Sequence, residues 1–287
     1  MEWPVSVGAN LYKGYDLVTV FQSLSRLGIR YVDLDFIKPP ATFKGNAYLA
    51  HISEEDLGRS AEIRTMMTDH GLEAVTFSGH MYLVRAEEVS LFKKKMRFAR
   101  EIGAKIISTN QGPRERADDF YRYMEEVVRE AEILDLIVGL ETAMPGDILE
   151  TGQDAGKLME RIGSPQVRLT YDTGNIFYSQ RGNINLPEDF HVALPYCSNL
   201  HFKDACLQDD RLHYCAVGQG LVSFDPICQM LREDHRHLPV TVEVPYFFES
   251  RNWSRFDTLD EIKPLAAVEE IVQTSLDFIR QRLGIVD

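Results

Sequence analysis

Four acidic or imidazole side chains close apolar segments in the second half of the chain. They are Glu141 in LIVGLET, Asp172 in VRLTYDTGN, His201 in SNLHFKD and Glu243 in PVTVEVP. Burying a carboxylate there is costly unless positive charge compensates it, and no Lys or Arg immediately beside these residues obviously does so. Three carboxylates and one imidazole suit a divalent cation such as Mn²⁺, Mg²⁺ or Zn²⁺. We interpret the four as ligands of one metal ion, although local pairing would explain any one of them alone.

The elements that carry these residues follow a regular alternation of short apolar segments and amphipathic helical segments. Gly28, Gly71 and Gly103 follow three of the predicted helices, where glycine commonly ends a helix. The predicted strands are 5–9, 29–36, 73–77, 105–109, 136–141, 167–171, 199–202 and 240–244. The predicted helices are 15–27, 53–70, 86–101, 120–134, 153–162, 189–194, 226–232 and 265–283.

Eight strand and helix units in 287 residues are typical of an α/β protein with a single (β/α)₈ TIM barrel, and we expect one domain over residues 1–287. An open doubly wound sheet is the alternative, but no GxGxxG turn follows the first predicted strand. Active sites of such barrels lie at the carboxyl ends of the strands. The four residues would therefore converge at the barrel mouth.

The composition excludes several classes of protein and partner. The chain is 44% hydrophobic and 26% charged, and its net charge of −13 disfavours nucleic acid. The densest basic run, Lys93, Lys94, Lys95 and Arg97, falls in a helical pattern where we predict a solvated face. No apolar stretch suits a membrane span, the N-terminus lacks a signal pattern and the four cysteines lack zinc spacing. We expect a cytoplasmic protein with free thiols that binds neither nucleic acid nor membrane.

The motifs ETA, YDTGN, HFKD, VGQG and VEVP occur in this order between Glu141 and Pro245. Their order resembles the xylose isomerase-like superfamily, which includes ketose 3-epimerases, hydroxypyruvate isomerases and inosose dehydratases. The resemblance spans nearly the whole chain and implies a TIM barrel with one divalent metal ion, Mn²⁺ in preference to Mg²⁺, Co²⁺ or Zn²⁺. It implies that the metal ligands are Glu141, Asp172, His201 and Glu243. By the same resemblance Glu141 and Glu243 also exchange protons with the substrate.

Four further residues are candidates for substrate binding. His80 ends the third predicted strand, at a place that resembles the site of a substrate or second-metal His in related enzymes, although a structural His is the alternative. Lys203 matches the family's HxKD motif, and Lys203 and Arg211 would supply positive charge to sugar oxygens, although a solvated side chain is the alternative for Arg211. Asn175 stands where relatives that act on free ketoses often carry His, and Leu207 stands where they carry Arg. The sequence therefore departs from the free-ketose pattern.

The predicted site would begin its chemistry by removing a carbon-bound proton. A metal that binds neighbouring hydroxyl and carbonyl oxygens acidifies the proton between them and stabilises the enediolate that forms. Proton exchange by Glu243 and Glu141 on opposite faces gives epimerisation, and return to the neighbouring carbon gives isomerisation. We predict a sugar or keto-polyol epimerase or isomerase with a small carbohydrate substrate. A dehydratase or lyase acting on a keto-sugar or inosose is the alternative, because it begins with the same step.

Two functions outside this chemistry have less support. A hydrolase of the AP endonuclease branch would need further His and Asp ligands, and Asn175 replaces one of them. A non-catalytic carbohydrate binder would not need both glutamates. Two segments, 38–51 and 245–256, are long enough to act as lids, and aromatic side chains in the second are alternatively suited to a homo-oligomer interface.

Overall fold

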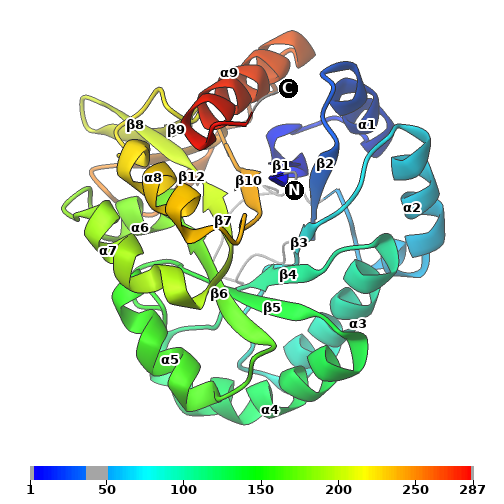
Figure 1. Ribbon diagram of the computed structural model, residues 1–287, viewed down its shortest axis with the longest axis vertical. Helices are drawn as coiled ribbons and strands as arrows, with labels where there is room; N and C mark the ends of the chain where they lie inside the picture. Colours follow the sequence, from blue (N-terminus) through cyan, green and yellow to red (C-terminus); the bar gives the residue numbers. More distant parts are fainter. Residues whose placement is uncertain (1–2, 37–50, 286–287) are drawn as a thin grey trace.

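The computed structural model describes residues 3–36 and 51–285. Its centre is a closed barrel of parallel strands in the order β1-β10-β7-β6-β5-β4-β3-β2, and helices surround it (Figure 1). The barrel strands are β1 (Val5–Gly8), β2 (Tyr31–Asp35), β3 (Thr76–Ser78), β4 (Ile106–Thr109), β5 (Ile137–Glu141), β6 (Val167–Asp172), β7 (Cys197–Phe202) and β10 (Val240–Val242). The predicted (β/α)₈ barrel is confirmed.

The surrounding helices agree with the sequence pattern. They are α1 (Leu17–Arg26), α2 (Ser60–Asp69), α3 (Ala86–Ile102), α4 (Ala117–Leu134), α5 (Ala155–Ile162), α7 (Leu186–Ala193), α8 (Phe224–Asp234) and α9 (Leu265–Leu283). Gly103 follows α3 directly with a φ of 108°, a left-handed conformation that glycine adopts without a steric cost. The predicted helix end at this position is therefore confirmed.

Alternation along the strands gives the barrel an apolar outside and a polar inside. Val32 and Leu34 of β2, for example, belong to the hydrophobic core, whereas Asp33 between them points the other way. The equivalent interior residues, each at most 1% exposed, are Ser6, Asp33, Thr76, Ser108, Thr170, Asn199 and Thr241. The hydrophobic core thus lies between the strands and the helices, and polar side chains line the barrel interior as far as its mouth.

Two parts of the fold were not predicted. A short helix, α6 (Thr173–Ser179), follows β6 directly. An antiparallel sheet of order β12-β11-β9-β8 lies beside the barrel. Its strands are β8 (Asp204–Gln208), β9 (Arg211–Cys215), β11 (Phe248–Arg251) and β12 (Asp257–Thr258).

This sheet changes the interpretation of the predicted lid 245–256, because β11 lies within it. Phe247 is fully buried and Tyr246 is 6% exposed, so both rings pack inside the chain. The other predicted lid, 38–51, lies outside the described residues except for His51.

The predicted solvated face of α3 is wrong at Lys95, which is fully buried. Its ammonium donates hydrogen bonds to the carbonyl oxygens of Phe36 at 2.7 Å and Gly79 at 3.0 Å. These carbonyls follow β2 and β3, so Lys95 ties together the carboxyl ends of two barrel strands. Lys94 and Arg97, in contrast, have side chains more than half exposed, at 55% and 57%.

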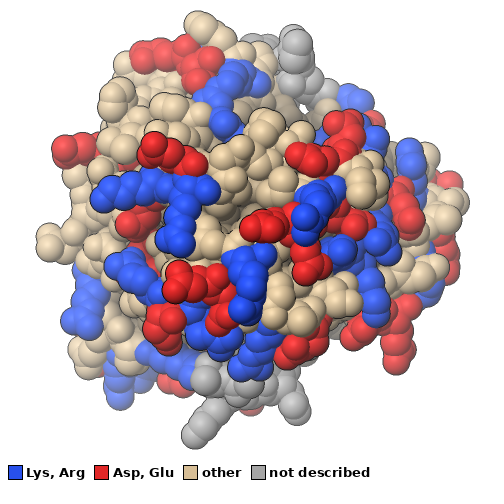
Figure 2. All heavy atoms as spheres, turned by 90° about the horizontal axis from the view of Figure 1, so that it is seen from below, with Lys and Arg blue, Asp and Glu red and all other residues tan. Residues whose placement is uncertain are grey.

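The face drawn in Figure 2 has no large patch of a single charge sign. Lys and Arg side chains are interspersed there with Asp and Glu. Among the described helices, none combines the length and apolar character of a membrane span. The four cysteines are free thiols, as expected.

Candidate metal centre

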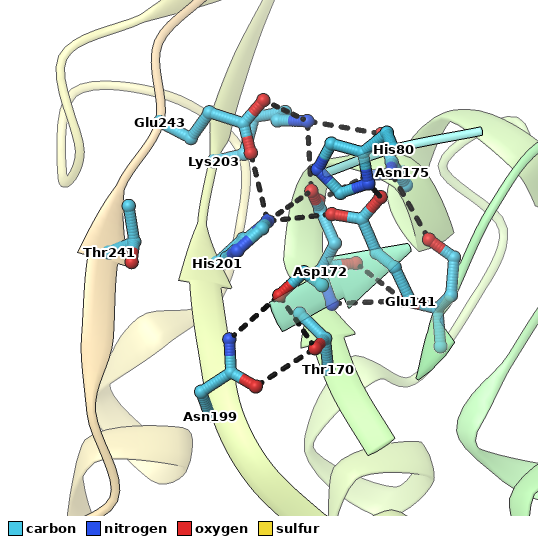
Figure 3. Close-up of polar contacts among 12 residues, drawn as sticks. His80, Glu141, Thr170, Asp172, Asn175, Asn199, His201, Lys203, Thr241 and Glu243 are labelled. Carbon is cyan, nitrogen blue, oxygen red and sulfur yellow. Dashed lines mark hydrogen bonds and ion pairs between the residues drawn. The ribbon is translucent and has the colours of Figure 1, made fainter. Parts of the chain in front are cut away.

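The four predicted ligands meet at the carboxyl ends of neighbouring barrel strands. Glu141 and Asp172 end β5 and β6, His201 lies near the end of β7, and Glu243 directly follows β10. In the strand register Asp172 pairs with His201, and Thr241, two residues before Glu243, pairs with His201 from the other side. One ligand atom from each residue lies within 4.8 Å of all the others. Figure 3 shows the four side chains turned toward one another.

The contacts within this cluster suit a cation. His201 Nδ1 lies 2.6 Å from Glu141 Oε1, 2.9 Å from Glu243 Oε2 and 3.8 Å from Asp172 Oδ2. None of these four buried atoms has a hydrogen bond of acceptable geometry to another described residue. Buried polar atoms are nearly always partnered in folded proteins. Three oxygens and one nitrogen that converge without hydrogen bonds therefore fit a divalent cation as their missing partner.

Lys203 corrects the expectation that no basic residue compensates the carboxylates. Its ammonium is buried, 2.8 Å from Asp172 Oδ2 and 3.2 Å from Glu243 Oε1, and it donates a hydrogen bond to Asn175 Oδ1. When ionised, three carboxylates and this one ammonium leave two negative charges, which a divalent cation would neutralise. The lysine thus offsets part of the burial cost without replacing the metal.

Burial and charge together set the protonation of the cluster. Burial raises the pKa of Asp172 to about 7 in spite of Lys203. Burial acts in the same direction on Glu243, but Lys203 and His201 outweigh it and hold the pKa of Glu243 well below its usual range. For His201, burial is outweighed by Glu141 and Glu243, which raise its pKa. Because metal ligands must be deprotonated, a cation that binds here would displace protons near neutral pH.

His80 lies against the cluster. Its Nδ1 is 3.4 Å from Glu141 Oε2, and its ring meets the edge of the His201 ring with centroids 5.9 Å apart. Burial, reinforced by the charge of His201, lowers the pKa of His80 to about 3, so its imidazole is neutral at pH 7. His80 Nδ1 has no hydrogen-bond partner among the described residues.

Asn175 reaches the site through the unpredicted helix α6. Asp172 is the N-cap of this helix, because its Oδ1 accepts a hydrogen bond of 2.8 Å from the Asn175 backbone N–H. The Asn175 side chain donates to the carbonyl oxygen of Thr142 and accepts from Lys203. One carboxyl oxygen of Asp172 therefore starts a helix while the other faces the metal cluster.

Arg211 lies apart from this cluster. It begins β9 with a side chain 49% exposed, and its guanidinium donates a hydrogen bond of 2.8 Å to Glu249 Oε1. This ion pair connects β9 with β11 and accounts for Arg211 without a substrate. Its role in substrate binding stays a prediction from the sequence.

Sequence reasoning missed the amides that orient the two glutamates. The buried Asn10, in a 3-10 turn after β1, donates a hydrogen bond of 2.9 Å to Glu243 Oε1. Asn110 donates to Glu141 Oε2 at 3.4 Å, and Gln111 donates to the Glu141 carbonyl oxygen at 2.6 Å. Each of these amides follows a barrel strand, as the metal ligands do. The same search of strand ends, extended to amides and to the first half of the chain, would have found them.

The HxKD motif also has a structural role through its last residue. The Asp204 carboxylate occupies a cradle of backbone N–H groups that a glycine loop supplies, and a Cβ at Gly220 would lie 2.3 Å from Asp204 Oδ1. The donors, at 2.8 to 3.0 Å, are the N–H groups of Ala205, Gly218, Gly220 and Val222. The VGQG loop therefore holds the chain next to Lys203 in place.

The fold and the site define a class: (β/α)₈ barrels whose mouth carries a buried cluster of carboxylates and histidine able to bind a metal. Residues 21–282 match the family described as xylose isomerase-like TIM barrel. The chain belongs to this family. No curated protein sequence matches it.

Several solved structures have the same fold over nearly the full length of both chains. A xylose isomerase domain protein from Planctomyces limnophilus is 17% identical, with 99% of each chain covered and a TM-score of 0.71. A D-psicose 3-epimerase from Clostridium cellulolyticum H10 is 12% identical, with 98% and 99% covered and a TM-score of 0.72. A probable 3-DHS dehydratase from Bacillus anthracis is 15% identical, with 95% and 99% covered and a TM-score of 0.66. At these low sequence identities, the structural likeness shows the fold alone.

Proposed function

We propose that the protein is a divalent-metal-dependent epimerase or isomerase of a sugar or keto-polyol, with Mn²⁺ as the preferred ion. The ion would be held by Glu141, Asp172, His201 and Glu243. The observation that carries the proposal is the meeting of four buried, mutually facing and unpartnered ligand atoms at the mouth of a barrel of this family. Sugar epimerases among the solved structures of the same fold favour a carbohydrate as the substrate class.

The protein's own groups would divide the proton transfers between two carboxylates. When bound, the cation would polarise a carbonyl oxygen and a neighbouring hydroxyl and so acidify the carbon-bound proton between them. Glu243 would be the base: Asn10 and Lys203 both contact its Oε1 and orient it, and its lowered pKa keeps it ionised while making it a weaker base than an unperturbed carboxylate. Glu141 would then return a proton on the opposite face. The two roles exchange when the reaction runs in reverse.

Other buried groups would bind the substrate's oxygens. Neutral His80 has an unpartnered Nδ1, and Lys203 carries a buried ammonium beside both Asp172 and Glu243. Asn175, held by Lys203, would help to shape the same side of the pocket. We propose that these three residues orient the sugar so that its reacting carbon faces the glutamates.

A solvent-exchange screen tests the proposal. The Mn²⁺-loaded protein would be incubated in D₂O with a panel of ketoses, 3-keto-sugars and inososes, and deuterium incorporation would be read by mass spectrometry. We expect incorporation at one carbon of at least one substrate, with a loss of about 10²- to 10⁴-fold in Glu243→Gln, which preserves the shape of the side chain. Exchange that survives full metal removal, or no exchange with any member of the panel, would contradict the proposal.

A dehydratase is the second candidate, because a probable 3-DHS dehydratase has the same fold. Dehydration shares the first proton abstraction but needs a proton donor for the departing hydroxyl, and the candidate is the buried Lys203 ammonium beside Asp172 and Glu243, although these carboxylates outweigh its burial and raise its pKa. The same screen separates the two reactions. Epimerisation leaves the substrate mass unchanged apart from deuterium, whereas dehydration yields a product lighter by one water.

A further inference from the structure

Beneath the candidate metal centre, a second carboxylate is buried in the barrel interior with only one of its oxygens satisfied. Asp33 of β2 is 1% exposed. Its Oδ2 accepts hydrogen bonds from the hydroxyls of Thr76 at 2.5 Å and Thr241 at 3.2 Å. Its Oδ1 has no hydrogen-bond partner among the described residues. Against the effect of burial, the Ser78 hydroxyl also lowers the pKa of Asp33 but makes no hydrogen bond of acceptable geometry to it, so Oδ1 can accept from a further donor.

His201 presents such a donor. Its Nδ1 faces the three carboxylates, which leaves Nε2 pointing away from the proposed metal. Nε2 is buried and has no hydrogen-bond partner among the described residues. A metal-bound histidine almost always donates its other ring N–H to a carboxylate, a carbonyl or a water, and this bond fixes its tautomer and orientation.

The strand register brings the two groups close together. Thr241 pairs with Ser6 on one side and with His201 on the other, so the three residues form a row across β1, β10 and β7. Neighbouring strands lie about 4.8 Å apart, and Asp33 contacts the middle residue of this row. Burial raises the pKa of Asp33 to about 6, and the charge of His201 acts in the opposite direction.

Asp33 and His201 are close without being in direct contact. The ion pairs of His201 within the described part of the chain are with Glu141, Asp172 and Glu243. Ser6, at one end of the row, has a buried hydroxyl oxygen that also has no hydrogen-bond partner in the described residues. His201 Nε2, Asp33 Oδ1 and Ser6 Oγ are thus three buried polar atoms without hydrogen-bond partners in the described residues, and three is the number of bonds that an ordered internal water typically makes.

We propose that Asp33 is a positioning residue for His201, connected to it through one ordered water that accepts from His201 Nε2–H and donates to Asp33 Oδ1 and Ser6 Oγ. The inference rests on the proposed role of His201 as a metal ligand. The arrangement keeps the proton on Nε2, directs the Nδ1 lone pair toward the metal and makes the imidazole a stronger ligand. Thr76 and Thr241 hold the carboxylate in place.

Metal affinity tests the proposal directly. Mn²⁺ binding would be measured by titration calorimetry for the native chain, Asp33→Asn, Asp33→Ala and a matched control, Ser108→Ala. Ser108 is an equally buried interior residue whose hydroxyl bonds to Thr170 and Asn199 instead. We expect the Kd to rise by about 10- to 100-fold in the Asp33 variants and by less than about twofold in the control. Thermal unfolding without metal would show that each variant is folded.

A spectroscopic readout distinguishes positioning from general destabilisation. In Zn²⁺-loaded protein with ¹⁵N-labelled histidine, we expect a slowly exchanging Nε2–H of His201, which shifts in Asp33→Asn and stays unchanged in Ser108→Ala. If the native chain binds Mn²⁺ and the Asp33 variants bind it equally well, the inference alone is overturned. If the native chain binds no Mn²⁺, both the proposed function and the inference are overturned.

Discussion

Two polar clusters inside the same barrel differ in whether their hydrogen bonds are made. In the interior, Ser108, Thr170 and Asn199 close a triangle of hydrogen bonds at 3.0, 2.8 and 3.3 Å. Gly139 makes this triangle possible, because a Cβ there would lie 2.1 Å from Thr170 Oγ1. At the mouth, four ligand atoms face one another without hydrogen bonds of acceptable geometry to the described residues, and only Asp172 Oδ2 has a cation, Lys203, beside it. Buried polar residues alone do not mark a binding site, whereas converging atoms that lack partners do.

The largest expected effect comes from separating the two proton-transfer roles at the mouth. In Glu141→Gln, saturated with Mn²⁺, we expect epimerisation to fall by about 10²- to 10⁴-fold because no carboxylate remains to return the proton. Exchange of the substrate proton that faces Glu243 should continue. Deuterium incorporation and product formation, measured on the same sample, check this. If deuterium exchange and product formation fall equally in the metal-saturated variant, Glu141 does not act only on the face of the reacting carbon opposite Glu243.

Breaking the mouth cluster should weaken metal binding and leave the fold intact. In Asp172→Asn we expect Mn²⁺ affinity to fall by at least the about 10- to 100-fold that follows loss of an outer partner, because a ligand itself is changed. The metal-free protein should still fold, because the amide oxygen can cap α6 and the Lys203 ammonium keeps its contact with Glu243 after losing the one with Asp172. Calorimetric titration and denaturant unfolding measure the two quantities. If Asp172→Asn lowered the stability of the metal-free protein but left Mn²⁺ affinity normal, Asp172 would be a structural residue and not a metal ligand.

Asp33, half satisfied, should give the metal-free protein a measurable pH dependence. Burial raises its folded-state pKa to about 6, above the ordinary 3.8, so its contribution to stability is full below pH 3.8 and is lost as pH rises through about 6. We expect the free energy of unfolding to fall, relative to Asp33→Asn, by up to about 3 kcal/mol over this window. Denaturant unfolding at several pH values compares the two chains. Parallel curves would show that the Asp33 pKa is not raised.

Breaking the interior triangle should have the smallest effect, and it should lower stability while leaving metal affinity nearly unchanged. Thr170→Val keeps the shape of the side chain but leaves the Ser108 and Asn199 groups without their threonine partner. We expect the free energy of unfolding to fall by about 1–3 kcal/mol, with Mn²⁺ affinity within about threefold of native. Urea unfolding and metal titration check this. A large loss of affinity would make the triangle part of the metal centre.

The barrel and the four ligands could be predicted because both depend on local patterns. Strand and helix periods are visible in single segments, and a polar residue that closes an apolar segment is visible without knowing its neighbours. Helix α6 was missed because Thr173–Ser179 is too short for a clear amphipathic period and because Asp172 was interpreted only as a ligand. Its second role as an N-cap was equally readable.

Lys95 is a residue whose burial the helical period indicated but whose basic neighbours led to the wrong prediction. Phe92, Lys95, Met96 and Ala99 occupy one helical face, and all four are buried. The helical period therefore places Lys95 on the apolar face, but the basic run around it suggested solvent. The contacts of Lys203 and Asn10 with Glu243 could not be predicted in the same way, because they join strands far apart in the sequence and depend on barrel closure.

Anomalous X-ray diffraction from crystals soaked with Mn²⁺ tests the central claim most directly. We predict one strong anomalous peak per chain, coordinated by Glu141 Oε1, Asp172 Oδ2, His201 Nδ1 and Glu243 Oε2, and none at this position in crystals of Asp172→Asn soaked at the same limiting concentration. A filled peak elsewhere, or no peak between these four atoms at saturating Mn²⁺, would contradict the account.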